Sequence, residues 1–370
     1  MPATANNAEP HLKYLDSARG IASLMVFATH FLSRNFQEKM NMHYFFLVFN
    51  GQEAVNFFFV LSGFVLSYKY IVRNKSLDVG PFYVSRFFRL FPGFFLMVLA
   101  GALFQHRGEL GLHFFKDLFV YNKYEFWEEA LLLRFHNKFY GPGWTLTFEM
   151  AVSFLMPFFI ALALKDRRLV AYLIVVTLII GNNLMCSYLF LFGILASCYY
   201  LEISDRSFRQ TKWFRYRYPI LIVAAIFFSL RHIDGIWPFG PTYKYIADYL
   251  HLDFAVYAGL ACFVFLVAIL HSKRVQRILE NRILVFFGKI SFSIYLVHVL
   301  VIDLLYLYLG NFLSGPDYRY RLVLVTLTCT LLVTLAATVL HYSVELPFMR
   351  LGKRITSKMK PSLVIGREVD

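Results

Sequence analysis

An arginine and a histidine share one face of an apolar segment near the start of the chain. Arg19 and His30 lie within YLDSARGIASLMVFATHFLS, residues 14–33, and are eleven positions apart. On an α-helix this separation turns through about 1100°, ~20° from three whole turns, and rises ~16 Å. Ionisable groups in a bilayer are costly unless they face a polar interior. The segment therefore offers a cation and a titratable base for function, unless Arg19 only reaches the headgroups and His30 only packs.

A carboxylate stands about one turn inside another apolar segment. Glu149 ends the run GPGWTLTFE, where an unpaired carboxylate would be expensive. His30 is a suitable partner, because a carboxylate fixes the tautomer of a histidine and stabilises the imidazolium formed after proton capture. A general base is one interpretation of this pair, and the sequence alone leaves open whether the two side chains touch.

Two arginines three positions apart fall on one helical face. Arg86 and Arg89 occur in SRFFRLFPG, at the expected cytoplasmic start of a span. The planar guanidinium binds phosphate through two parallel hydrogen bonds, so this pair suits a nucleotide-like ligand such as coenzyme A. Anchoring to lipid headgroups is the alternative, and it is the commoner use of basic residues at a membrane surface.

Polar residues also interrupt two other apolar segments. Ser62 and Gly63 fall near the middle of one, where a glycine lets a neighbouring helix or an acyl chain approach closely. Ser291, Tyr295 and His298 follow i, i+4, i+7 spacing in the other, so they line one face of a helix. Helix packing explains the first pair equally well, and a hydrogen-bond network between helices is the alternative for the second set.

The composition determines the class of protein that carries these residues. The chain has 370 residues, of which 58% are hydrophobic, and it has 42 Phe and 24 Tyr. No soluble core can hide that much apolar surface, so we predict a polytopic membrane protein. The formal charge of +14 lies in short basic blocks between apolar runs, which indicates membrane orientation rather than nucleic-acid binding. The four cysteines show no CxxC spacing, so neither disulfides nor a metal site is indicated.

Ten apolar windows are near the length needed to cross a bilayer. They are residues 14–33, 54–72, 82–104, 146–164, 169–181, 187–201, 219–230, 254–270, 290–309 and 322–341. Basic residues occupy every second connection and the C-terminal segment, so the positive-inside rule predicts both termini in the cytoplasm. At the inner end of the last span we expect His341 and Glu345 to be structural and Pro347 to end the helix.

These elements predict a single all-α domain, a polytopic membrane helix bundle over residues 1–360, followed by a short tail at 361–370. Residues 105–143 form a long outer loop of mixed charge, which we expect to fold as a partly amphipathic lid over the outer mouth of the bundle. The polar N-terminal residues show no cleavage pattern, so the first span is expected to remain as an uncleaved anchor.

The order and spacing of these motifs resemble the acyltransferase family 3 membrane enzymes over nearly the whole chain. The resemblance rests on Leu15-Asp16 followed by Arg-x10-His, EAVNFFFVLSGFVL, RxxR with Pro92 after it, WTLTFE, SFSIYLVH and VELP, at residues 15–30, 53–66, 86–92, 144–149, 291–298 and 344–347. Any one motif is weak, but their combination is specific. Asn56 stands where many members carry an acidic residue, and no SGNH hydrolase-like domain is expected after the bundle.

The resemblance implies transfer of an acyl group, most often acetyl, from cytoplasmic acyl-coenzyme A to a hydroxyl at the outer side of the cytoplasmic (inner) membrane. Implied acceptors are glycans, such as an exopolysaccharide, an O-antigen sugar or a lipid-linked oligosaccharide. The implied catalytic residues are His30, Arg19 and Glu149, and the implied acyl-coenzyme A residues are Arg86, Arg89, Ser62, Tyr295 and His298. His30 would deprotonate the acceptor or carry the acyl group, while Arg86 and Arg89 would hold the phosphates.

Other functions are compatible with the same residues. The acceptor could be a small secreted natural product, or the chain could transport a polysaccharide or lipid without acyl transfer, using buried ionisable groups as a relay. An inactive partner in an export complex is a third interpretation. The sequence leaves open which acyl group is transferred and which hydroxyl accepts it. It also leaves open whether transfer is direct or passes through an acyl-enzyme, and which oligomeric state the protein has, a homodimer being one option.

Overall fold

The structure is a computed structural model that describes residues 12–36, 43–180, 187–233, 254–313, 318–361 and 363–366. The α-helices are α1 (Lys13–Phe36), α2 (His43–Val48), α3 (Gly51–Ile71), α4 (Val79–Gln105), α5 (Leu112–Phe115), α6 (Phe126–Ala130), α7 (Gly143–Lys165), α8 (Arg167–Ile180), α9 (Ser187–Cys198), α10 (Tyr200–Ser204), α11 (Lys212–Arg215), α12 (Arg217–Ile233), α14 (Phe254–His271), α15 (Lys273–Leu279), α16 (Arg282–Lys289), α17 (Ser291–Leu313), α18 (Tyr318–Leu340) and α19 (Leu346–Thr356). The other elements are the π-helical turns η1 (Lys116–Val120) and η4 (His341–Glu345), the 3-10 helix η3 (Arg206–Gln210), and the strands β1 (Leu77–Asp78) and β2 (Val364–Ile365).

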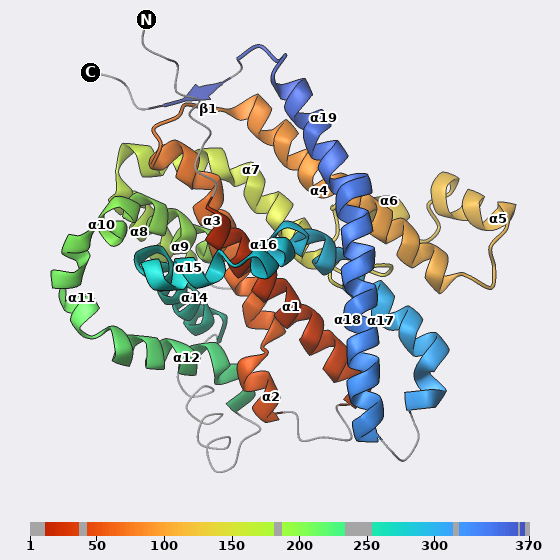
Figure 1. The fold of residues 1–370 in the computed structure, drawn as a ribbon. Helices are drawn as coiled ribbons and strands as arrows, with labels where there is room; N and C mark the ends of the chain where they lie inside the picture. Colours follow the sequence, from red (N-terminus) through yellow and green to blue (C-terminus); the bar gives the residue numbers. More distant parts are fainter. Residues whose placement is uncertain are drawn as a thin grey trace, which may run out of the picture.

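The predicted all-α membrane bundle is confirmed in its class (Figure 1). Each of the ten predicted windows contains a helix, although Gly181, the end of one window, lies outside the described residues. Within the described ranges, five helices are long and apolar enough to cross a membrane: Phe45–Ile71, Val79–Gln105, Gly143–Lys165, Ser291–Leu309 and Val323–Thr356. A sixth candidate is the pair Val256–His271 and Lys273–Leu279, bent by 94°. Ten crossings, with both termini in the cytoplasm, stay a prediction.

The last long helix does not end where the sequence predicts. Helical structure continues from α18 through η4 into α19, so the expectation that Pro347 ends it is wrong. Pro347 lies in the first turn of α19, where the missing N–H has no helical partner to lose. The preceding π-helical turn shifts the hydrogen-bond register just before the proline, which lets the chain continue as a helix.

Two glycines allow the backbones of α3 and α9 to pack closely. A Cβ at Gly63 would lie 2.1 Å from the carbonyl oxygen of Phe190, and a Cβ at Gly193 would lie 2.0 Å from that of Val60. Ser67 and Ser197 join the same two helices by a 2.7 Å hydrogen bond between their hydroxyls. Gly63 is therefore a helix-packing residue, which is one of the two roles that the sequence allowed.

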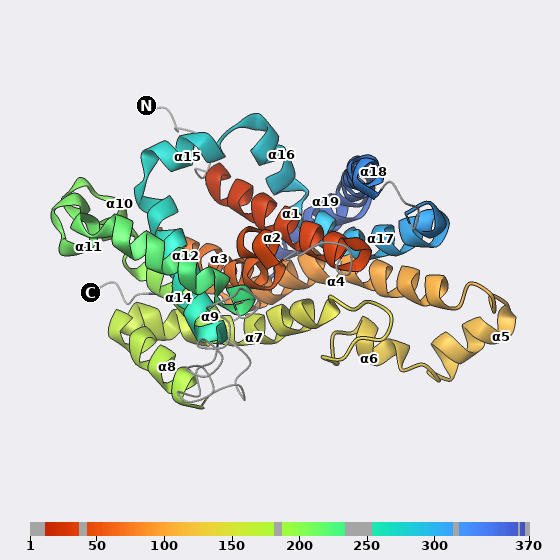
Figure 2. The ribbon, with the colours of Figure 1, turned by 90° about the horizontal axis from the view of Figure 1, so that it is seen from below.

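The long segment after α4 folds locally and lies beside the bundle. It contains α5, η1 and α6, and the buried carboxylate of Glu129 accepts hydrogen bonds from the backbone N–H groups of Lys138, Phe139 and Tyr140. Figure 2 shows α5 past one end of α4, whereas α6 lies alongside α4, where the Phe126 ring is 5.9 Å from the Phe95 ring between centroids. The part after α6 returns to the bundle, where the Tyr140 hydroxyl donates to the carbonyl of Tyr295 at 2.7 Å.

Part of the C-terminal tail is also ordered. β2 pairs antiparallel with β1, which precedes α4, so that Leu77 lies opposite Ile365 and Asp78 opposite Val364. The backbone N–H of Val79 donates to the carbonyl of Leu363 at 3.0 Å. The tail thus contacts the segment that begins α4, the helix that carries Arg86 and Arg89.

Candidate active site

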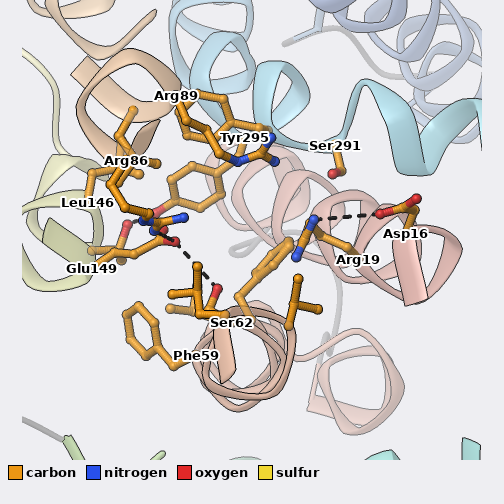
Figure 3. A pocket seen from close by; sticks show the side chains of 17 residues that line it. Asp16, Arg19, Phe59, Ser62, Arg86, Arg89, Leu146, Glu149, Ser291 and Tyr295 are labelled. Atoms are coloured by element: carbon orange, nitrogen blue, oxygen red, sulfur yellow. Dashed lines mark hydrogen bonds and ion pairs between the residues drawn. The ribbon is translucent and has the colours of Figure 1, made fainter. Parts of the chain in front are cut away.

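A cavity of about 320 Å³ opens between α1, α3, α4, α7 and α17 (Figure 3). We call it the arginine pocket, because three guanidinium groups from two helices line it. Its polar lining residues are Asp16, Arg19, Ser62, Arg86, Arg89, Thr145, Glu149, Ser291 and Tyr295. Phe58, Phe59 and Phe292 supply part of the apolar wall. The five helices thus bring together polar residues that are up to 279 positions apart, since the lining runs from position 16 to position 295.

A buried ion pair joins α4 to α7 inside the pocket. The Nη2 atom of Arg86 donates to Oε1 of Glu149 at 2.6 Å, and its Nε donates to the Ser153 hydroxyl at 3.2 Å. The Ser62 hydroxyl of α3 donates to the same Glu149 oxygen at 3.4 Å (Figure 3). The Arg86 side chain is only 9% exposed, so it lies within the bundle rather than on the membrane surface.

The other two arginines of the pocket have looser carboxylate contacts. Arg19 lies 3.8 Å from Asp16, one turn earlier on α1. Arg89 lies 4.0 Å from Glu345 and donates to the sulfur of Met349 at 3.4 Å. Their guanidinium groups are therefore held less firmly than that of Arg86, and either can turn toward an anion in the cavity.

His341 and the Ser293 hydroxyl hold the buried Glu345 that Arg89 approaches. Nδ1 of His341 lies 2.8 Å from the Glu345 carboxylate, and the Ser293 hydroxyl donates to it at 2.9 Å. This arrangement agrees with the expectation that His341 and Glu345 are structural. It also shows that the Glu345 carboxylate keeps two partners when Arg89 moves away.

Tyr295 forms the wall of the pocket toward the predicted outer side. Its hydroxyl donates to the carbonyl of Pro142 at 3.1 Å and lies 2.6 Å from the Thr145 hydroxyl, which fixes α17 against the start of α7. Its ring is 5.6 Å from the ring of His298, measured between centroids. Tyr295 therefore separates the pocket from a second polar group, which α17 and α1 form together.

His298 and His30 form that second group. Nδ1 of His298 lies 2.6 Å from the carbonyl of Tyr295, and because a carbonyl only accepts, this nitrogen carries the proton. His298 is fully buried, and within the described part of the chain its Nε2 has no hydrogen-bond partner. The ring of His30 lies 5.2 Å from the His298 ring, between centroids, and is itself exposed.

Comparison with protein families identifies the chain. A family model described as an acyltransferase domain matches residues 12–343. The chain belongs to acyltransferase family 3. It is a membrane acyltransferase, and this result disfavours both the transporter and the inactive partner. No curated protein and no solved structure matches the chain.

The structure brings together most of the site residues that the sequence predicts for this acyltransferase. The arginine pocket contains Arg19, Ser62, Arg86, Arg89, Glu149 and Tyr295. His30 and His298 lie next to one another outside the pocket lining, beyond Tyr295. The acyltransferase thus has a cationic cavity and a histidine pair, with one aromatic side chain between them.

One contact that the sequence suggested does not form. Glu149 binds Arg86 and Ser62, and no hydrogen bond or ion pair joins it to His30 within the described residues. The reason is geometric, because Glu149 faces α4 from its position on α7, whereas His30 lies near the far end of α1 against α17. His298 is the residue that contacts His30, and the sequence analysis did not pair the two.

Two polar residues of the pocket stand in the quoted motifs but were assigned no role from the sequence. Asp16 precedes Arg19 by three positions, a spacing that places both on one helix face, and this spacing was the available signal. Thr145 precedes Glu149 by one helical turn and bonds Tyr295, which no sequence pattern showed. In the described ranges no group of three or more His, Cys, Asp or Glu side chains has the geometry of a metal site.

Proposed function

We propose that this acyltransferase moves an acetyl group from acyl-coenzyme A, bound from the cytoplasmic side, to a hydroxyl of a glycan at the outer side of the cytoplasmic (inner) membrane. Exopolysaccharide or O-antigen sugars, free or lipid-linked, are the proposed acceptors. The observation that carries the proposal is the arginine pocket itself. Three guanidinium groups in one cavity suit the phosphates of a nucleotide-like donor, and the histidine pair lies beyond Tyr295, where an acyl group could be passed on.

The geometry supports a division of roles among the arginines. Arg86 is fully engaged with Glu149 and Ser153, so its proposed role is to fix the pocket wall. Arg89 and Arg19 have long carboxylate contacts and are the proposed phosphate ligands. A volume of about 320 Å³ is near the lower limit for ligand pockets, so the cavity suits the acyl-bearing arm with the adjoining phosphates and not the whole donor.

The histidine pair supports base chemistry at the other end of the path. Coenzyme A supplies the thioester, whose acyl carbon–sulfur bond breaks when the acceptor oxygen forms its new bond to the acyl carbon. His30 is proposed to take the proton from the acceptor hydroxyl and to return it to the departing thiolate. The Nδ1–H group of His298 donates a hydrogen bond to the Tyr295 carbonyl, so the lone pair of Nε2 points away from the helix backbone. An acyl group carried for a time by His30 is the alternative route.

The test is the amount of base-labile ester on the surface glycan of the host. Cells carrying the intact gene, a deletion, His30→Ala and His113→Ala are compared at equal protein level. His113 is exposed on α5, outside the bundle, so His113→Ala controls for loss of a histidine as such. We expect ester with the intact protein and with His113→Ala only. Ester in the deletion strain, or full ester with His30→Ala, would contradict the proposal.

A further inference from the structure

A second and larger cavity is lined by residues of α10, α11, α12, α14 and α15. These helices lie together on one side of the molecule (Figure 1 and Figure 2). We call this cavity the α12–α14 groove. Its volume is about 870 Å³, and none of its lining residues lines the arginine pocket. Acyl transfer as proposed above therefore leaves this cavity unexplained.

The walls of the groove are apolar along most of its length. Phe263 and Val267 of α14 face Ile220 and Leu221 of α12 across it, and these side chains are half-buried. From Phe263 to His271, where α14 ends, the groove follows eight residues, or ~12 Å of helix. One leaflet is about half of the ~30 Å hydrocarbon core of a bilayer, so the groove fits within the depth of one leaflet.

One end of the groove is strongly basic. Arg209, Arg217, Lys273 and Arg274 line it there. Among the residues that the structure describes, none of the four forms an ion pair, and the acidic lining residue Glu202 is already bound to Arg167 at 2.5 Å. The end of the groove thus has four cationic side chains whose charge no described carboxylate neutralises.

A basic end in this position is expected at the level of a membrane surface. The chain turns by 94° between α14 and α15, so Lys273 and Arg274 follow directly after a long apolar helix that ends at His271. The exposed Trp213 and Tyr218 lie beside the same end, and such aromatic residues favour the headgroup region of a bilayer. From these neighbours we infer that the cationic end is at the depth of the lipid phosphates.

The basic end is held in place by its own contacts. Nη1 of Arg217 donates to the carbonyl of Phe214 at 2.9 Å, and its guanidinium lies over the rings of Phe214 and Tyr218 at 4.2 and 4.4 Å. The His271 ring lies between Phe208 and Phe214, with centroid distances of 5.0 and 5.2 Å. These contacts hold α11 and η3 against α14, so the basic end of the groove has a defined structure.

We infer that the α12–α14 groove binds one anionic phospholipid of the predicted cytoplasmic leaflet. Its phosphate lies among Arg209, Lys273 and Arg274, and one of its acyl chains lies between α12 and α14. Charge complementarity selects the anionic headgroup, and the depth of the groove selects a lipid over a soluble phosphate. The inference does not depend on the acyl donor or acceptor, because no residue of the proposed active site takes part.

The test uses the full-length protein, purified in a neutral detergent, with bound lipid counted by native mass spectrometry. Phosphatidylglycerol and phosphatidylcholine with identical chains are compared for the wild type, for Lys273→Gln/Arg274→Gln and for Lys212→Gln/Arg215→Gln. The second double variant removes the same charge from α11, at exposed residues that do not line the groove. We expect roughly tenfold preference for phosphatidylglycerol in the wild type and the control, and a preference below about threefold in the groove variant.

Two further measurements separate the possible causes. Ala268→Trp fills the apolar part of the groove and leaves the basic end intact, so it should lower lipid occupancy, while the thermal unfolding midpoint reports whether the variant is folded. Soluble glycerol phosphate should not displace phosphatidylglycerol. Equal binding of the two lipids, an equal loss in the control variant, or displacement by glycerol phosphate would each overturn the inference.

Discussion

The bundle and residues 105–143, which we call the outer segment after the side predicted for them, each contain an ion-paired carboxylate, and the two differ in burial. In the bundle, Glu149 is 18% exposed and pairs with Arg86, which is 9% exposed. In the outer segment, Glu125 is 43% exposed and pairs with Arg134 and Lys138. The residue types are alike, but the first pair is shielded from water and the second is not.

This difference changes what each pair does for the protein. A buried ion pair adds little net stability, yet removal of one partner leaves an uncompensated charge in a medium that solvates it poorly. An exposed pair exchanges its partners for water at little cost. We therefore infer that the Arg86–Glu149 pair is kept for the function of the pocket, which needs charged side chains. The contacts of Glu125 with Arg134 and Lys138 only support the local fold of a loop.

The largest effect is expected when the buried pair is broken. Glu149→Ala leaves the Arg86 guanidinium without a carboxylate, with a loss of about 3–5 kcal/mol of stability. The thermal unfolding midpoint and the yield of monodisperse protein in detergent measure this loss. Glu125→Ala, measured in parallel, should change both very little, and an equal loss in the two variants would break the comparison.

A double substitution separates the structural role of the pair from its functional role. Arg86→Met/Glu149→Leu replaces the ion pair with apolar side chains, which restores most of the stability that Glu149→Ala loses. We expect this folded variant to make no glycan ester, because the pocket then lacks both charges. If it makes normal ester, the pair serves only to pack α4 against α7.

The helices of the site could be predicted from apolar windows, although not their first turns. The windows that start at residues 54, 82 and 146 correspond to α3, α4 and α7, and each helix begins three residues earlier, at Gly51, Val79 and Gly143. These first turns read GQE, VGP and GWT, and each contains a glycine together with a polar residue or a proline. A search for apolar runs misses such turns because they are less apolar than the rest of the helix.

The contacts between helices could not be predicted in the same way. Ser62 and Gly63 are neighbours in sequence, yet Ser62 reaches Glu149 in the pocket while Gly63 touches the backbone of Phe190 on α9. Successive residues of a helix point about 100° apart, so one turn can serve both a site and a packing contact. Likewise, Glu149 binds Arg86 and not His30 because of how the helices lie relative to one another, and the spacing of residues in the sequence does not give that arrangement.

A smaller loss is expected for the buried carboxylate of the outer segment. Glu129 accepts hydrogen bonds from three backbone N–H groups, and in Glu129→Gln one of the two acceptor oxygens becomes an amide that cannot accept. We expect a loss of about 1–3 kcal/mol, seen as faster proteolysis within residues 105–143. Glu109→Gln, at a side chain that is 69% exposed, is the control and should leave the cleavage rate unchanged.

The pocket arginine with the loosest carboxylate contact should affect donor binding more than stability. Arg89→Ala removes a cation 4.0 Å from Glu345, but that carboxylate keeps His341 and Ser293 as partners, so the fold should persist. We expect KM for acyl-coenzyme A to rise about tenfold with little change in kcat, as for the loss of one charge-assisted hydrogen bond. Arg350→Ala, at an exposed residue of α19, should leave KM unchanged, and an unaltered KM in Arg89→Ala would rule out a phosphate contact there.

The smallest effect belongs to the exposed pair, and it should depend on pH. Hydrogen bonds from Lys138 and then Arg134 lower the pKa of Glu125 from its usual 4.5 to about 2. A lowered pKa in the folded state stabilises the protein above the unfolded pKa, and this stabilisation disappears as the pH falls through the folded pKa. The unfolding midpoint of Glu125→Gln should therefore lie slightly below that of the wild type above about pH 4.5. The difference between the two unfolding midpoints should disappear as the pH falls toward about 2. A difference that stays constant over this range would show that the carboxylate charge of Glu125 does not stabilise the outer segment.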